Sequence, residues 1–226
     1  MSWNDKSESG LRRDFGRRGG RQFVRPRDDP PGTSRLFIAV PAADEVRVAV
    51  GKLMEEVAGG PIGERGPGQP RWVRVADLHL TMRFLGATPD GRQAEIAAAL
   101  ATTAAQTAPF RVVLAGGGAF PNAFAPRVLW IGITEGSDDL AELARRLNVE
   151  LVPLGWPAET RPFTPHLTLA RTDGVAGADE RARVLAEAAR DVQLTWQADR
   201  IVLYKTLVGR GPVHYESLAE ARLTLS

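Results

Sequence analysis

The sequence predicts an α+β domain made of two related lobes with a central cleft. Two observations carry this prediction. The stretches 78–82 and 165–169 each place His-Leu-Thr before an apolar residue, and they hold two of the three histidines in the chain. Strand-like and helix-like segments also follow one another in a similar order in the two halves.

The first half begins with an apolar run at 36–40, which we predict to be a central strand. Apolar residues then recur at helical spacing over 44–57, where an aspartate supplies an N-cap oxygen and two glycines follow the last turn. A short strand at 72–75 precedes the first histidine strand, 78–86, and the Ala-rich stretch 90–107 predicts a second helix.

The second half repeats this alternation. A strand at 110–114 runs into three glycines at 116–118, which favour a bulge or strand corner over a phosphate-binding loop because no Lys-Ser/Thr follows them. Beyond this point we predict a strand at 126–133, an amphipathic helix at 137–152, the second histidine strand ending at Arg171, a helix at 178–190, strands near 192–196 and 201–204, and a return strand over 214–225.

The composition is that of a globular protein. The chain has 226 residues, of which 43% are hydrophobic and 25% charged, so it can bury a core. It has no cysteine, which excludes disulfides and thiolate metal sites and fits a reducing compartment. No apolar run approaches the roughly 20 residues of a membrane span, and no signal peptide is recognisable. We therefore expect a cytoplasmic protein that does not enter a membrane.

The N-terminal residues 1–34 predict a disordered basic tail, and 35–226 a single domain. Residues 1–35 hold nine Lys/Arg and five Asp/Glu among many Gly, Ser and Pro. Arginines spaced by glycine could contact RNA phosphates, although a solvated tail is the favoured interpretation.

The two histidine strands suggest where the chemistry takes place. Side chains at i and i+2 of a strand share a face, so His79 and Thr81 share one face while Leu80, Met82 and Phe84 can bury the other. If the two strands lie side by side, two imidazoles and two hydroxyls line one cleft.

The second strand repeats this pattern. His166 and Thr168 share a face, with Leu167 and Leu169 opposite. Strict alternation would put Arg171 on the Leu167 face, and a bulge at the strand end could redirect it.

This residue set suits acid–base chemistry at phosphorus. One imidazole can take a proton from the nucleophile and the other can give one to the leaving oxygen, because the ordinary imidazole pKa, about 6.5, is close to working pH. Threonine hydroxyls can donate to phosphate oxygens. The third histidine, His214, lies outside either frame and is better explained as a surface or edge-strand residue.

The two frames and their neighbours resemble the two-histidine phosphoesterase superfamily, and within it the RNA 2′,3′-cyclic phosphodiesterase (LigT-like) family. The matching stretches cover nearly everything beyond the tail, and they are 35–40, 78–86, 118–121 with 126–132, 161–171, and 201–204 with Tyr215.

The resemblance implies a bilobal two-histidine phosphoesterase-like fold, with two pseudo-symmetric antiparallel-sheet lobes and helices outside. It implies hydrolysis of RNA 2′,3′-cyclic phosphate ends to a 2′-phosphate with no metal. We expect a monomer that needs no cofactor and acts on such RNA ends or on a small cyclic nucleotide. By motif match, His79 is the proton donor, His166 the proton acceptor, and Thr81, Thr168 and Arg171 hold the phosphate.

Two departures bear on substrate preference. Asp77 stands where many relatives carry Asn, and Lys205-Thr206 where a serine is common. Two other functions stay open: the reverse reaction, which joins RNA 2′,5′ ends, and a non-catalytic RNA-binding module whose histidines only contact phosphate.

Overall fold

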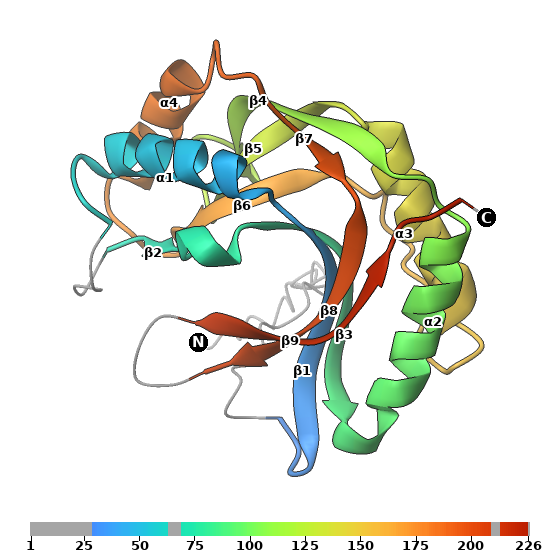
Figure 1. Ribbon diagram of the computed structural model, residues 1–226. Coiled ribbons are helices and arrows are strands. Elements are labelled where there is room, and N and C mark those ends of the chain that lie inside the picture. The colour runs from blue at the N-terminus through green and yellow to red at the C-terminus, as the bar shows by residue number, and fades with distance from the viewer. Residues whose placement is uncertain (1–28, 63–68, 209–212, 226) are drawn as a thin grey trace, which may run out of the picture.

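The computed structural model describes residues 29–62, 69–208 and 213–225. The strands form one curled sheet in the order β7-β4-β5-β6-β3-β1-β8-β9, with β2 paired to β6, and the helices lie outside it (Figure 1). The strands are β1 (Thr33–Pro41), β2 (Arg71–Trp72), β3 (His79–Pro89), β4 (Phe110–Phe120), β5 (Val128–Glu135), β6 (His166–Arg171), β7 (Leu194–Ala198), β8 (Arg200–Leu207) and β9 (His214–Arg222). The α-helices are α1 (Asp44–Ala58), α2 (Gln93–Ala105), α3 (Ser137–Leu151) and α4 (Ala178–Ala188), and short 3₁₀ turns span Val75–Asp77 and Asp90–Arg92.

The sheet divides into two lobes at the junction of β3 and β6. The first lobe holds β3, β1, β8 and β9, and the second holds β6, β5, β4 and β7 with β2. Neighbouring strands within each lobe pair antiparallel over several residues, whereas one register pair, Leu80 with Leu167, joins β3 to β6. The predicted α+β fold with two related antiparallel lobes is confirmed.

The helices are exchanged between the lobes. α1 follows β1 of the first lobe but packs against α4 and β7 of the second. α3 follows β5 of the second lobe but packs against α2 and β3 of the first. Both helices have the amphipathic stripe that the sequence predicts, and the stripe is buried at Val46, Val50, Leu53, Met54 and Val57 in α1 and at Leu140, Leu143, Leu147 and Leu151 in α3.

Several predicted boundaries are wrong, and three of them bear on the entry to an element. The strand expected at 72–75 is limited to Arg71–Trp72, because β2 has a partner only at the last two residues of β6. The chain then forms the 3₁₀ turn 75–77. The helix expected from residue 90 also begins with a 3₁₀ turn, and α2 starts at Gln93.

The third boundary is that of the basic tail. β1 begins at Thr33, inside the stretch 1–34 that was expected to be disordered, and Ser34 is buried with its hydroxyl donating to Asp90. Arg35 also forms an ion pair with Asp29. The expectation for residues 1–28 lies outside the described residues.

The three glycines at 116–118 form a bulge, one of the two features predicted for them, but β4 continues through them to Phe120, past the strand end expected at 114. Gly116 has a φ of +70° and has no partner in the register with β5. Gly118 lies against Trp130, where a Cβ atom would come within 2.3 Å of the indole ring. The small residue therefore lets Trp130 lie flat across the sheet beside the second histidine strand.

In the part of the chain that the structure describes, no helix has the length and apolar character needed to cross a membrane.

Candidate active site

Each histidine is the first residue of a strand at the centre of the sheet. His79 opens β3 and His166 opens β6. The Nδ1 of His79 lies 2.6 Å from the carbonyl oxygen of Asp77, and the Nδ1 of His166 lies 2.7 Å from that of Thr164. A carbonyl oxygen only accepts hydrogen bonds, so Nδ1 carries the proton in both rings. Nε2 is therefore the nitrogen available for proton transfer.

The junction between the lobes brings the two motifs together. Leu80 and Leu167 are register partners and both are fully buried. Continuing this antiparallel register by one residue in each direction places His79 across from Thr168 and His166 across from Thr81. These four side chains lie on the face of the sheet opposite to Leu80 and Leu167. Such cross-strand neighbours lie about 5 Å apart and diagonal ones about 7–8 Å apart. The two imidazoles are therefore diagonal neighbours.

The two threonines differ in their contacts. The hydroxyl of Thr81 donates to Nε2 of His79, with the two atoms 3.1 Å apart. Within the described ranges, the Nε2 of His166 and the hydroxyl of Thr168 have no hydrogen-bond partner. The second motif is therefore the more open of the two toward a ligand.

A bulge in β6 places Arg171 on the histidine face. Thr168 pairs with Trp130 and Ala170 with Leu129, so Leu169 is the unpaired extra residue. Leu169 and Ala170 are both buried, and the alternation resumes one residue later. The charge of Arg171 lowers the pKa of His166, in agreement with this placement.

The same bulge occurs in β3 and overturns the expectation for Phe84. Met82 has no partner between Thr81 and Arg83 in the register with β1. Met82 and Arg83 are both buried, and Phe84 then points to the histidine face, where its side chain is 59% exposed. The expectation that Phe84 is buried with Leu80 is thus wrong.

Aromatic side chains surround both imidazoles. The ring centroid of His79 lies 4.9 Å from that of Phe37 and 5.3 Å from that of Tyr215, which meets it edge-on. The ring of His166 meets Phe120 edge-on at 5.0 Å. Sequence reasoning took Phe37 only as part of a buried strand. It lies two strand positions from Ala39, the partner of Thr81, and so shares the histidine face, but this register is not readable from the sequence.

Burial keeps both imidazoles neutral. It lowers the pKa of His79 to about 4, and the positive charges of His166 and Arg47 act in the same direction. Burial also lowers the pKa of His166, with Arg171 adding to the effect. The hydrogen bond to a carbonyl opposes this lowering in each case. Each imidazole is therefore preferentially uncharged in the free protein.

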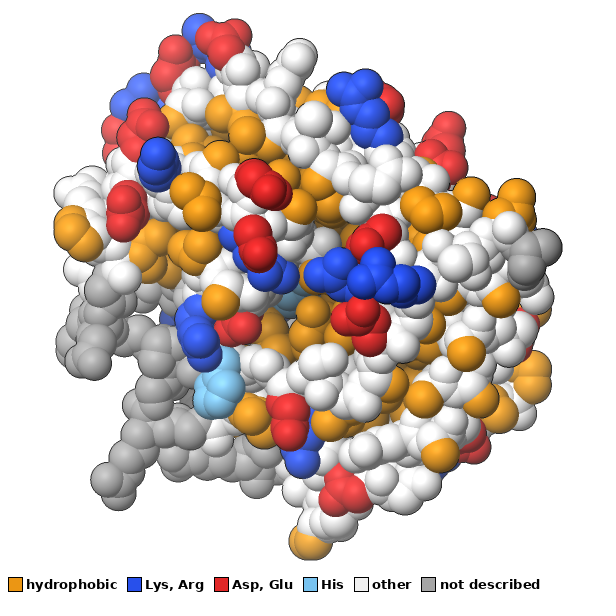
Figure 2. All heavy atoms as spheres, viewed as in Figure 1, with side chains coloured by type: hydrophobic (Ala, Val, Ile, Leu, Met, Phe, Trp, Pro, Cys, Tyr) orange, Lys and Arg blue, Asp and Glu red, His pale blue; other side chains and the backbone are white. Residues whose placement is uncertain are grey.

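Asp77 and His214 lie beside the first motif. Burial raises the pKa of the Asp77 carboxyl, although the charges of Arg74, His214 and Arg47 oppose this. His214 is the first residue of β9. Its charge acts on Asp77, so it lies near the first motif without belonging to either motif. The described residues contain no group of three or more His, Asp or Glu side chains arranged to hold a metal ion. Figure 2 shows a hollow in which histidine atoms lie behind a rim of basic and acidic side chains.

Proteins of similar sequence are known. A protein of Geobacillus stearothermophilus named RNA 2′,3′-cyclic phosphodiesterase is 36% identical over 82% of this chain, which spans only 56% of that protein's length. One of the same name from Aeropyrum pernix is 32% identical over 68% of this chain and 86% of its own.

Solved structures show the same fold. The protein TT0787 of Thermus thermophilus matches with a TM-score of 0.68 and 28% identity, over 85% of this chain and 99% of its own. E. coli LigT in its apo form matches over the same shares with a TM-score of 0.62 and 22% identity. Residues 46–210 match a family described as the 2′-5′ RNA ligase superfamily. The chain, with its paired histidine strands, belongs to the 2′-5′ RNA ligase superfamily.

Proposed function

We propose that this protein is an RNA 2′,3′-cyclic phosphodiesterase that hydrolyses the cyclic phosphate to a 2′-phosphate. One observation carries the proposal: two imidazoles, each with Nδ1 fixed by a carbonyl, present Nε2 to one face of the sheet on either side of the Leu80–Leu167 pair. The names of the relatives from Geobacillus and Aeropyrum support it.

In the proposed reaction, His166 Nε2 takes a proton from water as the water oxygen attacks phosphorus. The bond from phosphorus to the 3′ oxygen breaks, and His79 gives that oxygen a proton from Nε2. The resemblance assigns these directions, since the two motifs are otherwise alike. Thr81, Thr168 and Arg171 hold the non-bridging phosphate oxygens as charge develops. No metal or other cofactor takes part in this scheme.

The depressed pKa of His79 sets a requirement on this scheme. A group that is neutral in the free protein must gain a proton before it can act as the acid. A bound phosphate anion favours the charged imidazolium, because an opposite charge within about 4–6 Å raises an imidazole pKa. Substrate binding thus prepares its own proton donor, and the Thr81 hydroxyl is then released from Nε2 to the phosphate.

Ligation is a second candidate. The family description names RNA 2′-5′ ligation, and the same acid–base pair serves it when an RNA 5′-hydroxyl attacks the cyclic phosphate in place of water and the 3′ oxygen leaves. Water and an RNA 5′-hydroxyl would compete for the same cyclic phosphate. Both motifs belong to a single chain, so a monomer is sufficient for either reaction, and we propose that the protein acts as one in the cytoplasm.

The test uses a short RNA that ends in a 2′,3′-cyclic phosphate, with EDTA present. We expect a 2′-phosphate product, no 3′-phosphate, and no turnover by a His79→Ala, His166→Ala double variant. A second RNA with a 5′-hydroxyl reveals ligation if it is joined through a 2′-5′ linkage. Tight binding without any turnover would identify the RNA-binding module instead and refute the proposal.

A further inference from the structure

The segment between α3 and β6, residues 152–165, determines how His166 is held. It contains turns but no helix or strand, and it leads directly into His166. The carbonyl that fixes the imidazole belongs to Thr164 in this segment. Its position therefore depends on whatever immobilises the segment.

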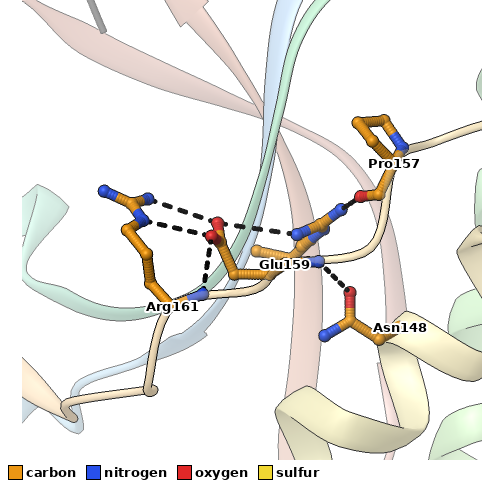
Figure 3. A network of polar contacts seen from close by, with 5 residues as sticks. Asn148, Pro157, Glu159 and Arg161 are labelled. Atoms are coloured by element: carbon orange, nitrogen blue, oxygen red, sulfur yellow. Dashed lines mark hydrogen bonds and ion pairs between the residues drawn. The ribbon is translucent and has the colours of Figure 1, made fainter. Parts of the chain in front are cut away.

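Arg83 of the first lobe reaches this segment from β3. Its side chain is only 6% exposed, and its guanidinium donates to the carbonyl oxygen of Pro157 and lies 3.7 Å from the carboxylate of Glu159. Glu159 is itself held by the guanidinium of Arg161 at 3.1 Å and 3.2 Å. The backbone N–H of Glu159 donates to the side chain of Asn148 in α3 at 3.4 Å. Figure 3 shows the guanidinium of Arg161 against the Glu159 carboxylate and the side chain of Asn148 against the Glu159 backbone.

A second arginine of the first lobe holds the beginning of the same segment. Arg92 donates to the carbonyl oxygen of Leu154, and its guanidinium lies over the ring of Trp156 at 4.0 Å from the centroid. Trp156 is buried. Two arginines from one lobe thus hold the chain that leads to the histidine of the other.

The chain that leads to His79 is anchored on the second lobe through its backbone, since Trp72 pairs with Ala170 of β6 and the N–H of Val73 donates to the carbonyl oxygen of Leu169. The residue of β6 that matches Arg83, directly after the bulge, is Ala170. The carbonyl that holds His79 belongs instead to Asp77, in a 3₁₀ turn closed by the N–H of Asp77 donating to the carbonyl of Arg74. The approach to His79 is thus held by backbone pairing, whereas the approach to His166 is held by arginine side chains from the other lobe.

We propose that Arg83 is a positioning residue for His166. It holds residues 157–165 so that the Thr164 carbonyl keeps the proton of His166 on Nδ1 and directs Nε2 into the cleft. The catalytic consequence rests on the proposed function, whereas the effect on the imidazole does not. Removing one member of an ion pair is costly where the other charge is left buried and unpaired. Glu159 is 29% exposed and keeps its ion pair with Arg161, so Arg83→Met can separate positioning from folding.

The primary measurement is the tautomer of each histidine by nitrogen NMR. We expect wild-type His79 and His166 to carry the proton on Nδ1. In Arg83→Met, His166 should become a mixture of tautomers while His79 is unchanged. Arg145→Met, which removes an exposed ion pair with Glu142 on α3, is the matched control and should alter neither ring.

Turnover provides the second measurement. Misplacement of a catalytic group by about 1 Å can cost up to roughly 100-fold in rate, so we expect kcat of Arg83→Met to fall by about 10- to 100-fold, with KM nearly unchanged. Arg83→Lys should recover part of the lost kcat. If Arg83→Met does not fold, Glu159→Gln removes the partner charge and should shift the His166 tautomer in the same direction.

An unchanged His166 tautomer in a folded Arg83 or Glu159 variant overturns the inference. A shifted tautomer in a protein whose wild type has no phosphodiesterase activity leaves the inference standing and refutes the proposed function.

Discussion

Phe84 and Arg171 occupy equivalent positions on the two histidine strands, each five residues after its histidine and just past a bulge. The bulge in each strand therefore places an aromatic ring on one side of the cleft and a cation on the other. The lobes are alike in fold but unlike in what they offer a ligand. An anionic phosphate is favoured on the side of the second lobe.

Arg171→Ala should weaken phosphate binding and change the titration of His166. The charge of Arg171 lowers the pKa of His166, so removing this charge should raise that pKa in an NMR titration. KM should rise at least about 10-fold, which corresponds to a loss of about 1.4 kcal/mol in binding free energy. Arg127→Ala, at an exposed arginine just before β5, is the control. A His166 pKa that stays constant in Arg171→Ala would contradict this placement.

Replacing either histidine by alanine should lower kcat by at least about 100-fold, the low end for a lost general acid or base. The double variant should be far less than multiplicative, because the two imidazoles act in one step. Steady-state kinetics on a dinucleotide 2′,3′-cyclic phosphate measures both effects. Near-normal turnover by either single variant would remove that histidine from the mechanism.

A substrate with a good leaving group at the 3′ position should distinguish the two roles. Such a group departs with little help from an acid, so it should restore much of the activity of His79→Ala and little of that of His166→Ala. The ratio of kcat values for the good and the natural leaving group gives the answer in each variant. Rescue of His166→Ala instead would exchange the roles and leave the reaction class intact.

Activity should show two bell-shaped pH profiles with different maxima. The profile of kcat/KM reports the free protein, in which burial lowers both imidazole pKa values, so its maximum should lie below about 6.5. The profile of kcat reports the complex, where the phosphate anion raises both values, and should lie at higher pH. Coincident maxima would show that the substrate does not charge either imidazole. Both limbs belong to the pair if the rings are strongly coupled.

Stability should fall in acid because of His79. Its pKa falls from 6.5 to about 4 on folding, so between these values the unfolded chain binds a proton that the folded protein does not. The free energy of unfolding should therefore decrease as pH drops through this window, by about 3 kcal/mol at about 1.4 kcal/mol per pKa unit. Urea unfolding from pH 7 to 4 measures the slope. His79→Asn should flatten it more than His166→Asn, and equal slopes in wild type and His79→Asn would contradict the burial of His79.

Local patterns predicted most of the fold. The stripes of α1 and α3 were readable because each helix buries one face, and the histidine–threonine faces followed from the period of a strand. The orientation of Phe84 was missed because a bulge depends on which residues of the partner strand pair, and that is set by β1. For Arg171 the same uncertainty left both faces open until the register with β5 was known.

The support of the site was beyond sequence reasoning for a related reason. Arg83 and Glu159 are far apart in the chain, and nothing in either local pattern marks them as partners. Arginines are mostly exposed in folded proteins, yet Arg83 is buried because α3 and the following segment cover that part of β3. Contacts of this kind depend on how the lobes exchange their helices.

That exchange ties the two lobes together more firmly than the Leu80–Leu167 pair would by itself. A lobe isolated by cutting the chain would lose a helix that packs on it and keep one whose apolar stripe has no surface to cover. Neither half can then bury its own core, so we expect the whole of the described fold to unfold in one cooperative transition. Opening of the cleft by separating the lobes is correspondingly costly, and ligands must enter a site whose walls keep a fixed spacing.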